Sequence, residues 1–295
     1  MGNILKKEEI LKLLTEANNI SLPDIQKSLD YVLKGHAEVL QSLYESQPKL
    51  EEGEVYIETL IMKMIFTSKS VLELSKGKEF VSLKGDKKFE IIDIPSIYIL
   101  TRSIIEIFLT LEYLYFNELE REERLFRYDL WRISGFMSRQ YHLGKLQNQN
   151  AEKLKKEKIL IDELKLKLKE NKYYSSLKKQ QIWKLDKYGL PRLISWIDLL
   201  KQSSLKDRFL NMYRLYSNYA HSEYLSMIQI NEISLNKSIP FNISATKTSL
   251  NNVRMINCMT ILLLSEKFNC VALTYQSLDE KLRFTIEFWE KISKK

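Results

Sequence analysis

The sequence predicts an all-α protein, an up-and-down helical bundle with a small β-hairpin-like excursion near residues 80–92. Helix breakers are scarce, because the 295 residues include only 8 Gly and 5 Pro, and few breakers favour long helices. Several long segments repeat apolar residues every three to four positions, as a helix with one buried face requires. No internal repeat or low-complexity linker is visible. We therefore expect a single helical domain over residues 1–295.

The N-terminal part, residues 1–77, is expected to hold three helices, over residues 4–17, 21–45 and 55–74. Ser21 suits an N-cap, and Pro23 and Asp24 suit the first turn that follows it. Gly77 suits the end of the third helix. Residues 78–94 differ from their surroundings: two short apolar runs flank Lys84-Gly85-Asp86-Lys87, a pattern typical of a β-hairpin.

The rest of the chain reads as further helices, expected over residues 97–117, 118–141, 150–171, 194–200, a segment containing 214–221, 248–273 and 278–292. The helix near residues 150–172 is highly charged, with Leu160, Leu164 and Leu168 repeating on one side. Such a helix either projects as an arm or covers the bundle. Residues 228–246 are expected to be polar and irregular, with Pro240 as a breaker.

The common cofactor and metal signatures are absent from the sequence. It has no glycine-rich phosphate-binding motif and no serine-hydrolase motif. The three histidines are scattered, and Cys258 and Cys270 are not at a metal-ligand spacing. We expect no cofactor and no metal. No signal peptide is apparent, and Glu106 and Glu112 interrupt the most apolar run. A cytoplasmic protein without a membrane segment is expected.

Positive charge is concentrated in one segment. The net charge is +8, and residues 151–192 carry 12 Lys and one Arg against four Glu and two Asp, a net of +7. Clustered cations attract phosphate backbones without sequence preference, which makes RNA a candidate partner. A solvated, lysine-rich helix explains the same pattern equally well, so both interpretations stay open.

The segment Tyr213-Arg214-Leu215-Tyr216-Ser217-Asn218-Tyr219-Ala220-His221 contains the principal candidate site. On a helix, seven residues return almost to the starting direction, so Arg214, Asn218 and His221 line one stripe, with Ser217 beside them. Arginine grips phosphate through two parallel N–H bonds, and histidine transfers protons near neutral pH. An arginine and a histidine are the smallest set of side chains that metal-free RNA cleavage requires. The alternative is the ordinary polar face of an amphipathic helix.

Arg102 and Glu106 lie one turn apart in the most apolar predicted helix. Charged residues are rarely placed in a core helix unless they are paired. We interpret them as a supporting pair that orients Arg214 and His221. An i,i+4 ion pair at the edge of the bundle is the alternative.

The stretch Arg214 to His221 fits the R-x4-6-H pattern of the HEPN superfamily. Together with the Arg-x3-Glu helix (Arg102, Glu106) and the Tyr-x3-Ser-x-Tyr-x-His helix, it resembles poorly characterised bacterial HEPN-like proteins, some associated with phage defence by abortive infection. The resemblance covers roughly residues 95–275. It implies a helical bundle, frequent homodimerisation and, in active members, metal-independent endoribonuclease chemistry with Arg214 and His221 as the active-site pair. Leu215 departs from the polar residue that many active members carry after the arginine.

We therefore expect an endoribonuclease that acts on cellular RNA, as a toxin or phage-defence effector. A homodimer is expected, and an antitoxin or regulatory protein is a candidate partner. A non-catalytic module that binds a protein, a nucleotide or RNA is the second hypothesis. A protein whose basic helix docks on anionic lipid is the third, although that helix lacks large aromatic anchors.

Overall fold

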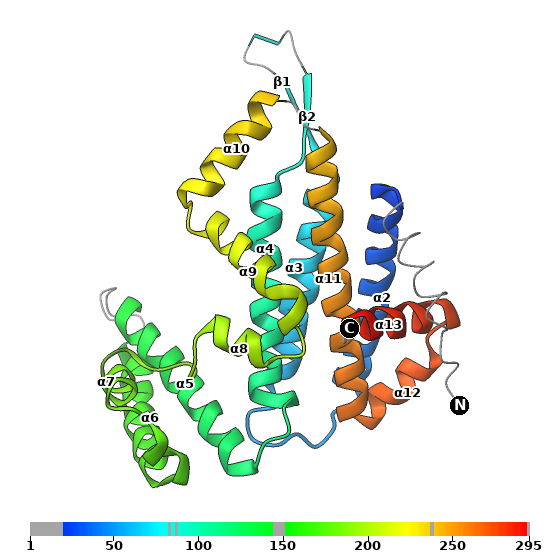
Figure 1. Cartoon of the computed structure of the whole chain (residues 1–295). Helices are drawn as coiled ribbons and strands as arrows, with labels where there is room; N and C mark the ends of the chain where they lie inside the picture. The colour runs from blue at the N-terminus through cyan, green and yellow to red at the C-terminus, as the bar shows by residue number, and fades with distance from the viewer. Residues whose placement is uncertain (1–19, 82–83, 86–87, 144–150, 237–238, 294–295) are drawn as a thin grey trace. The chain divides into compact units, whose positions relative to one another are not determined.

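The computed structural model describes residues 20–81, 84–85, 88–143, 151–236 and 239–293. The helix expected over residues 4–17 lies outside these ranges. The prediction of an all-α protein with one hairpin-like excursion is confirmed. The elements, shown in Figure 1, are α2 (Leu22–Ser46), α3 (Tyr56–Leu74), β1 (Lys78–Val81), β2 (Lys88–Ile91), α4 (Ile94–Leu111), the π-helix η1 (Glu112–Phe116), α5 (Arg121–Leu143), α6 (Ala151–Glu170), the 3₁₀ helix η2 (Lys172–Ser176), α7 (Lys179–Tyr188), α8 (Trp196–Gln202), α9 (Lys206–Ala220), α10 (Tyr224–Asn236), α11 (Ile239–Lys267), α12 (Asn269–Ser277) and α13 (Glu280–Ser293).

The contacts of the chain divide it into two compact units. Unit 1 consists of Met1–Pro48, Glu58–Phe108 and Asp207–Lys295, and unit 2 of Lys49–Ile57 and Leu109–Lys206. In sequence, therefore, most of unit 2 is one continuous insertion into unit 1. That the whole chain forms a single domain stays a prediction, and each unit is described by itself.

Unit 1 is organised around α11, which packs against α2, α12 and α13. A buried polar contact joins three of its helices. The Nδ1 of His36 on α2 lies 2.8 Å from Oδ1 of Asn257 on α11, and Nδ2 of Asn257 donates to Oγ of Ser68 on α3 at 3.0 Å. All three residues are fully buried. Because unpaired polar groups are costly inside a protein, this contact favours one arrangement of the three helices.

The hairpin and the apolar helix after it, as far as Phe108, also belong to unit 1. β1 and β2 are antiparallel, with Lys78 opposite Ile91 and Val81 opposite Lys88. The following stretch, Ile94–Phe116, is the one part of the described chain long and apolar enough to cross a membrane by length and composition alone. More than half of it is buried inside the protein, as is usual for a core helix.

Unit 2 is built on α5, against which α6 packs. Ile161, Leu164 and Leu168 of α6 are buried in one cluster with Phe126, Leu130 and Ile133 of α5. The charged helix thus packs on α5 within unit 2. Leu164 and Leu168 of the expected apolar stripe are buried and Leu160 is half-buried, whereas most lysines of this helix are exposed.

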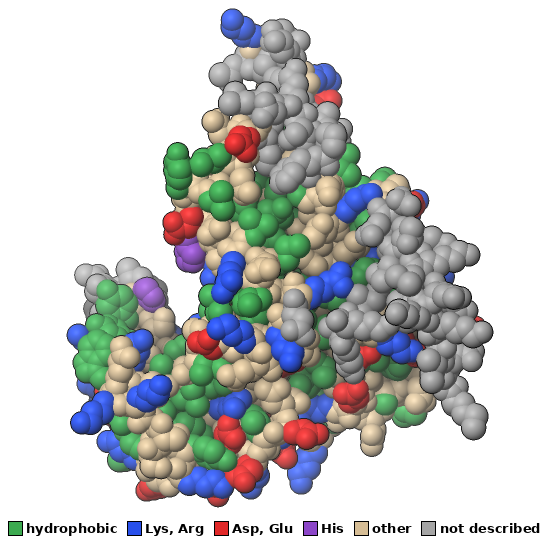
Figure 2. All heavy atoms as spheres, in the orientation of Figure 1, with side chains coloured by type: hydrophobic (Ala, Val, Ile, Leu, Met, Phe, Trp, Pro, Cys, Tyr) green, Lys and Arg blue, Asp and Glu red, His purple; other side chains and the backbone are tan. Residues whose placement is uncertain are grey.

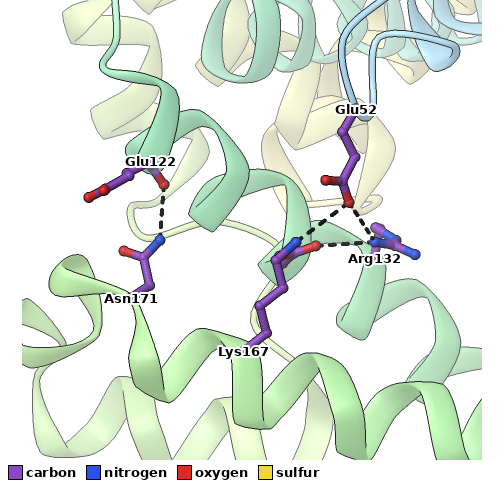
Figure 3. A network of polar contacts seen from close by, with 6 residues as sticks. Glu52, Glu122, Arg132, Lys167 and Asn171 are labelled. Carbon is purple, nitrogen blue, oxygen red and sulfur yellow. Dashed lines mark hydrogen bonds and ion pairs between the residues drawn. The ribbon is translucent and has the colours of Figure 1, made fainter.

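An ion-pair network reinforces unit 2 (Figure 3). The carboxylate of Asp129 on α5 is only 2% exposed, and it lies 3.0 Å from Nζ of Lys167 on α6 and 3.2 Å from Nη1 of Arg132. Glu52, in the turn before α3, lies 3.5 Å from the same Lys167. A buried carboxylate requires such partners, because removing one leaves an uncompensated charge.

Several expected element boundaries were wrong. The described residues of 228–246 are not irregular: α10 continues to Asn236 and α11 begins at Ile239, with Pro240 in its first turn. Proline is tolerated there because its missing N–H would have no helical partner. The helix expected over residues 248–273 ends at Lys267, where Phe268 takes an extended conformation before α12. α7, after the charged helix, was missed.

Candidate functional site

The candidate site lies in unit 1, where α9 packs on α4 through tyrosines. The ring of Tyr98 on α4 lies 4.8 Å from the rings of both Tyr216 and Tyr219 on α9. All three rings are buried, and the hydroxyl of Tyr219 donates to Oε1 of Gln229 on α10 at 2.9 Å. Aromatic pairs at such distances add to the free energy gained by burying the rings. This packing fixes where the polar face of α9 meets α4.

Four side chains meet at this junction. Arg102 on α4 donates from Nε to Oε1 of Glu106 at 3.0 Å, and its Nη1 lies 3.3 Å from Nε2 of His221. The hydroxyl of Tyr213 on α9 donates to the same Glu106 oxygen at 2.8 Å. Arg102 Nη2 also lies 3.5 Å from that hydroxyl. We call these four residues the Arg102 network.

The network has a defined hydrogen-bond direction. A guanidinium has no lone pair to accept with, so Nε2 of His221 accepts from Arg102 and a neutral imidazole carries its proton on Nδ1. Burial, followed by the hydrogen bond to Glu106, raises the pKa of Tyr213 to about 12. Tyr213 is therefore a neutral hydroxyl near pH 7, able to donate to the carboxylate. The side chains of Arg102 and Glu106 are 17% and 26% exposed, which places the pair at the edge of the core.

His221 lies at the end of α9 rather than within it. The helix ends at Ala220, although the N–H of His221 still donates to Ser217 O at 3.1 Å. The N–H of Ser222 then donates to Tyr219 O, and that of Glu223 to Asn218 O. With Ser222 in the left-handed region (φ 53°), this is a Schellman C-cap with His221 as the C-cap residue. The prediction that one helix carries both Arg214 and His221 was wrong by one residue, because α9 ends at Ala220.

The remaining predicted site residues lie on the same face of α9 but outside the network. Arg214 is exposed, and no described residue forms an ion pair or hydrogen bond with its guanidinium. Asn218 is half-buried and its side chain likewise has no hydrogen bond within the described part of the chain. The Ser217 hydroxyl donates to its own helix, at Tyr213 O, 2.7 Å away. The structure therefore places His221 against Arg102, and leaves Arg214 available to a ligand.

Tyr213 is the network member that sequence reasoning missed. Its hydroxyl contacts both Arg102 and Glu106, yet in the sequence it stands out only as the first residue of the Tyr-x3-Ser-x-Tyr-x-His pattern. In the described part of the chain, no three His, Cys, Asp or Glu side chains are arranged to hold a metal ion.

Unit 2 has a pocket that the sequence did not predict. It has a volume of about 440 Å³, and its lining includes Tyr56, Trp131, Arg132 and Arg139. Both arginines are paired with carboxylates: Arg139 lies 2.9 Å from Glu157, and Arg132 belongs to the network of Figure 3. Their charges are thus largely compensated within unit 2.

Comparison with known proteins identifies the family of this chain. A family model matches residues 54–238, more than half of the 295 positions. The chain belongs to DUF5677. DUF5677 is described as a family of unknown function. No curated protein and no solved structure matches the chain.

The part matched by the DUF5677 model includes every residue of the Arg102 network. It also includes Arg214 and the lysine-rich segment of unit 2, whereas α2, α12 and α13 lie outside it. The candidate site thus belongs to the family region, and the three-helix contact through His36 depends on flanking elements.

Proposed function

We propose that this DUF5677 protein is a HEPN-like, metal-independent endoribonuclease that cleaves cellular RNA at the Arg102 network. The observation that carries the proposal is the 3.3 Å approach of the Arg102 guanidinium to Nε2 of an exposed histidine. A cation beside a proton-transfer group, with the exposed Arg214 on the helix that ends at this group, suits attack on a phosphodiester.

In the proposed reaction the RNA supplies its own nucleophile. The ribose 2′ oxygen bonds to phosphorus while the bond from phosphorus to the 5′ oxygen breaks, which leaves a 2′,3′-cyclic phosphate and a 5′ hydroxyl. Nε2 of His221 accepts the 2′-hydroxyl proton once the Arg102 guanidinium has turned from it to the phosphate, and water protonates the leaving 5′ oxygen. Arg214 binds the phosphate, and Arg102 stabilises the charge that develops on its oxygens.

Two further features support this assignment of roles. Glu106 and Tyr213 both contact Arg102, so its guanidinium stays at the site when its Nη1 moves from His221 to a phosphate oxygen. Arg214 is exposed, so binding a phosphate would break no contact with a described residue. Ser217 already bonds to its own helix, which leaves Asn218 as the side chain to contact RNA or orient the histidine.

The test is cleavage of total cellular RNA by the purified chain in EDTA. Wild type should give discrete fragments with 2′,3′-cyclic phosphate ends. We expect His221→Ala to slow cleavage by about 10²- to 10⁴-fold, the usual contribution of a general base, and Arg214→Ala to slow it by about 10²-fold or more. His142→Ala is the matched control, because His142 is an exposed histidine on α5 in unit 2. Cleavage that survives His221→Ala would refute the assignment.

The second candidate function is a non-catalytic module that binds a protein, a nucleotide or RNA. One observation favours it: Arg102 already makes contacts to Glu106, Tyr213 and His221, as a purely structural arginine would. Under this alternative, wild type and His221→Ala would both fail to cleave RNA, with and without a cellular partner added.

We also propose that the protein acts as a homodimer and has an antitoxin or regulatory protein as a partner. Support comes from the start of α10, immediately after His221, where Tyr224, Leu225 and Met227 are 80%, 49% and 43% exposed. Exposed apolar side chains gathered on one short segment are typical of a surface that is covered in an assembly.

A further inference from the structure

The outer face of α7 in unit 2 combines lysines with aromatic rings. Trp183 and Tyr188 are 52% and 58% exposed, although tryptophan is usually well buried in folded proteins. Their rings meet edge to face, with centroids 5.6 Å apart and planes at 76°. Nζ of Lys187 lies 5.1 Å from both ring centroids. We call the exposed side chains of Lys179, Trp183, Lys184, Lys187 and Tyr188 the α7 face.

Helical geometry explains why these residues share one surface. Lys179, Trp183 and Lys187 are four residues apart and form one row, and Lys184 and Tyr188 form the adjacent row. Leu185 is buried on the opposite side of the helix, in the apolar cluster of unit 2. The aliphatic residues of this helix therefore pack against the core, whereas its aromatic residues are exposed to solvent.

The charge of the α7 face is not compensated by its neighbours. Lys179, Lys184 and Lys187 form no ion pair with any residue in the described part of the chain. The carboxylate of Asp186, the acidic residue of the helix, lies 3.8 Å from Nζ of Lys165 on α6. The same Nζ also donates to the backbone carbonyl of Asp186 at 3.2 Å. Figure 2 shows Lys and Arg side chains beside apolar ones at the lower left, in the region of α6 and α7.

We propose that the α7 face binds single-stranded RNA. Bases stack on exposed aromatic rings regardless of sequence, and the lysines of the same face contact the phosphates. The edge-to-face arrangement leaves at least one face of each ring uncovered by the other ring. Only the choice of RNA as the ligand rests on the proposed function.

Stacking and phosphate contacts can be separated by their salt dependence. The probe is a fluorescent single strand of about 12 nucleotides, within the usual site sizes for such proteins, made of 2′-O-methyl RNA. It lacks the attacking hydroxyl, so binding is measured without cleavage. We expect Trp183→Ala to weaken binding by about tenfold without changing the salt slope, and Trp183→Phe to restore part of the loss. Lys184→Ala and Lys187→Ala should each reduce the slope of log K against log salt by about 0.7.

Control variants on other helices should bind the probe as wild type does. Tyr44→Ala on α2 and Lys63→Ala on α3 remove an exposed ring and an exposed lysine elsewhere. All variants are first checked by thermal melting, where exposed substitutions should shift the midpoint by no more than about 2 °C. Binding by Trp183→Ala within about twofold of wild type would overturn the proposal, as would an equal loss in the two controls.

The remaining outcomes separate this inference from the proposed nuclease. If binding depends on the α7 face while unmodified RNA stays intact, the binding surface stands and the nuclease assignment fails. If unmodified RNA is cleaved but Trp183→Ala binds normally, the reverse holds. Vesicles rich in anionic lipid are the second probe. If they bind through Trp183 while the single strand does not, the face is a membrane-contact surface and the RNA proposal is wrong.

Discussion

A polar side chain in the interior of a helical bundle stabilises it only while its partners are present. Tyr213 illustrates this, because its hydroxyl lies between Glu106 and Arg102 at the edge of the core. Arg214, the next residue on the same helix, is exposed and has no such partner among the described residues. Substitutions at these two positions should therefore differ in their effect on stability.

We expect Tyr213→Phe to lower the free energy of unfolding by about 1–1.5 kcal/mol, because it leaves Glu106 without one hydrogen-bond donor. Arg214→Ala should change it by no more than about 0.5 kcal/mol, since the side chain is exposed. Urea unfolding of both variants beside wild type measures the difference. An equal loss in the two variants would show that Arg214 supports the fold, which would favour the non-catalytic alternative.

His36 should make the stability of the protein depend on pH. Burial lowers its pKa from 6.5 to about 4. Below pH 6.5 the unfolded chain binds a proton that the folded chain does not, so acidification favours unfolding until the folded pKa is reached. Between roughly pH 7 and pH 5 this should cost about 2 kcal/mol.

The comparison of wild type with His36→Gln isolates that contribution, because glutamine does not titrate. The variant should be less stable at pH 7, since it disturbs the contact with Asn257, but it should lose about 2 kcal/mol less than wild type on acidification. Parallel pH profiles for the two proteins would contradict the assignment.

At the residue scale the sequence predicted part of the candidate site. The spacing of Arg102 and Glu106 indicates a pair within one helix, and this pair exists at 3.0 Å. The approach of Arg102 to His221, and the position of Tyr213 beside them, depend on how far α9 is shifted and rotated along α4. The tyrosine packing between the two helices sets that register, and no local pattern encodes it.

At the scale of elements, the end of α9 determines where His221 lies. Ser222 occupies the left-handed position of the C-cap with φ 53°, a conformation that costs a non-glycine residue about 1 kcal/mol or more. The sequence has no glycine there, so the usual signal for a helix end was missing. The lack of a sequence signal also explains why the helix break at Phe268 was not predicted, because neither glycine nor proline occurs there.

Ser222→Gly should therefore stabilise the protein by up to about 1 kcal/mol, by removing the strain of the left-handed position. Ala220→Gly is the matched control. It introduces glycine two residues earlier, inside the helix, and should destabilise by about 0.5–1 kcal/mol. Thermal or urea unfolding would measure both. Destabilisation by Ser222→Gly would mean that its side chain contributes more than its backbone costs.

At the scale of the whole molecule, the all-α class followed from composition and periodicity, because few breakers and repeated apolar positions leave little choice. The division into two units was not visible in the sequence, since no Pro- or Gly-rich linker marks where unit 2 begins or ends. The longer segment of unit 2 begins at Leu109, within α4. A continuous helix therefore lies at this boundary, where a linker would be expected.

The proposed homodimer makes a prediction for the intact chain. Light scattering after size exclusion should give twice the monomer mass of 35.0 kDa, because the exposed apolar residues at the start of α10 would be buried. Leu225→Glu and Met227→Glu should shift the protein to the monomer. Leu273→Glu, at a 68% exposed position on α12, should not. A monomer at all concentrations of wild type would refute the dimer.

The placement of unit 2 within the chain also has a consequence during synthesis. Arg102 and His221 are 119 positions apart, and most of the residues between them belong to unit 2. Because a ribosome adds residues in order, Arg102 and Glu106 leave it long before Tyr213 and His221 exist. A chain that ends anywhere within residues 109–206, whether nascent or truncated, holds only half of the Arg102 network. If the network is the centre of a toxic activity, the cell is exposed to that activity only once translation has passed unit 2.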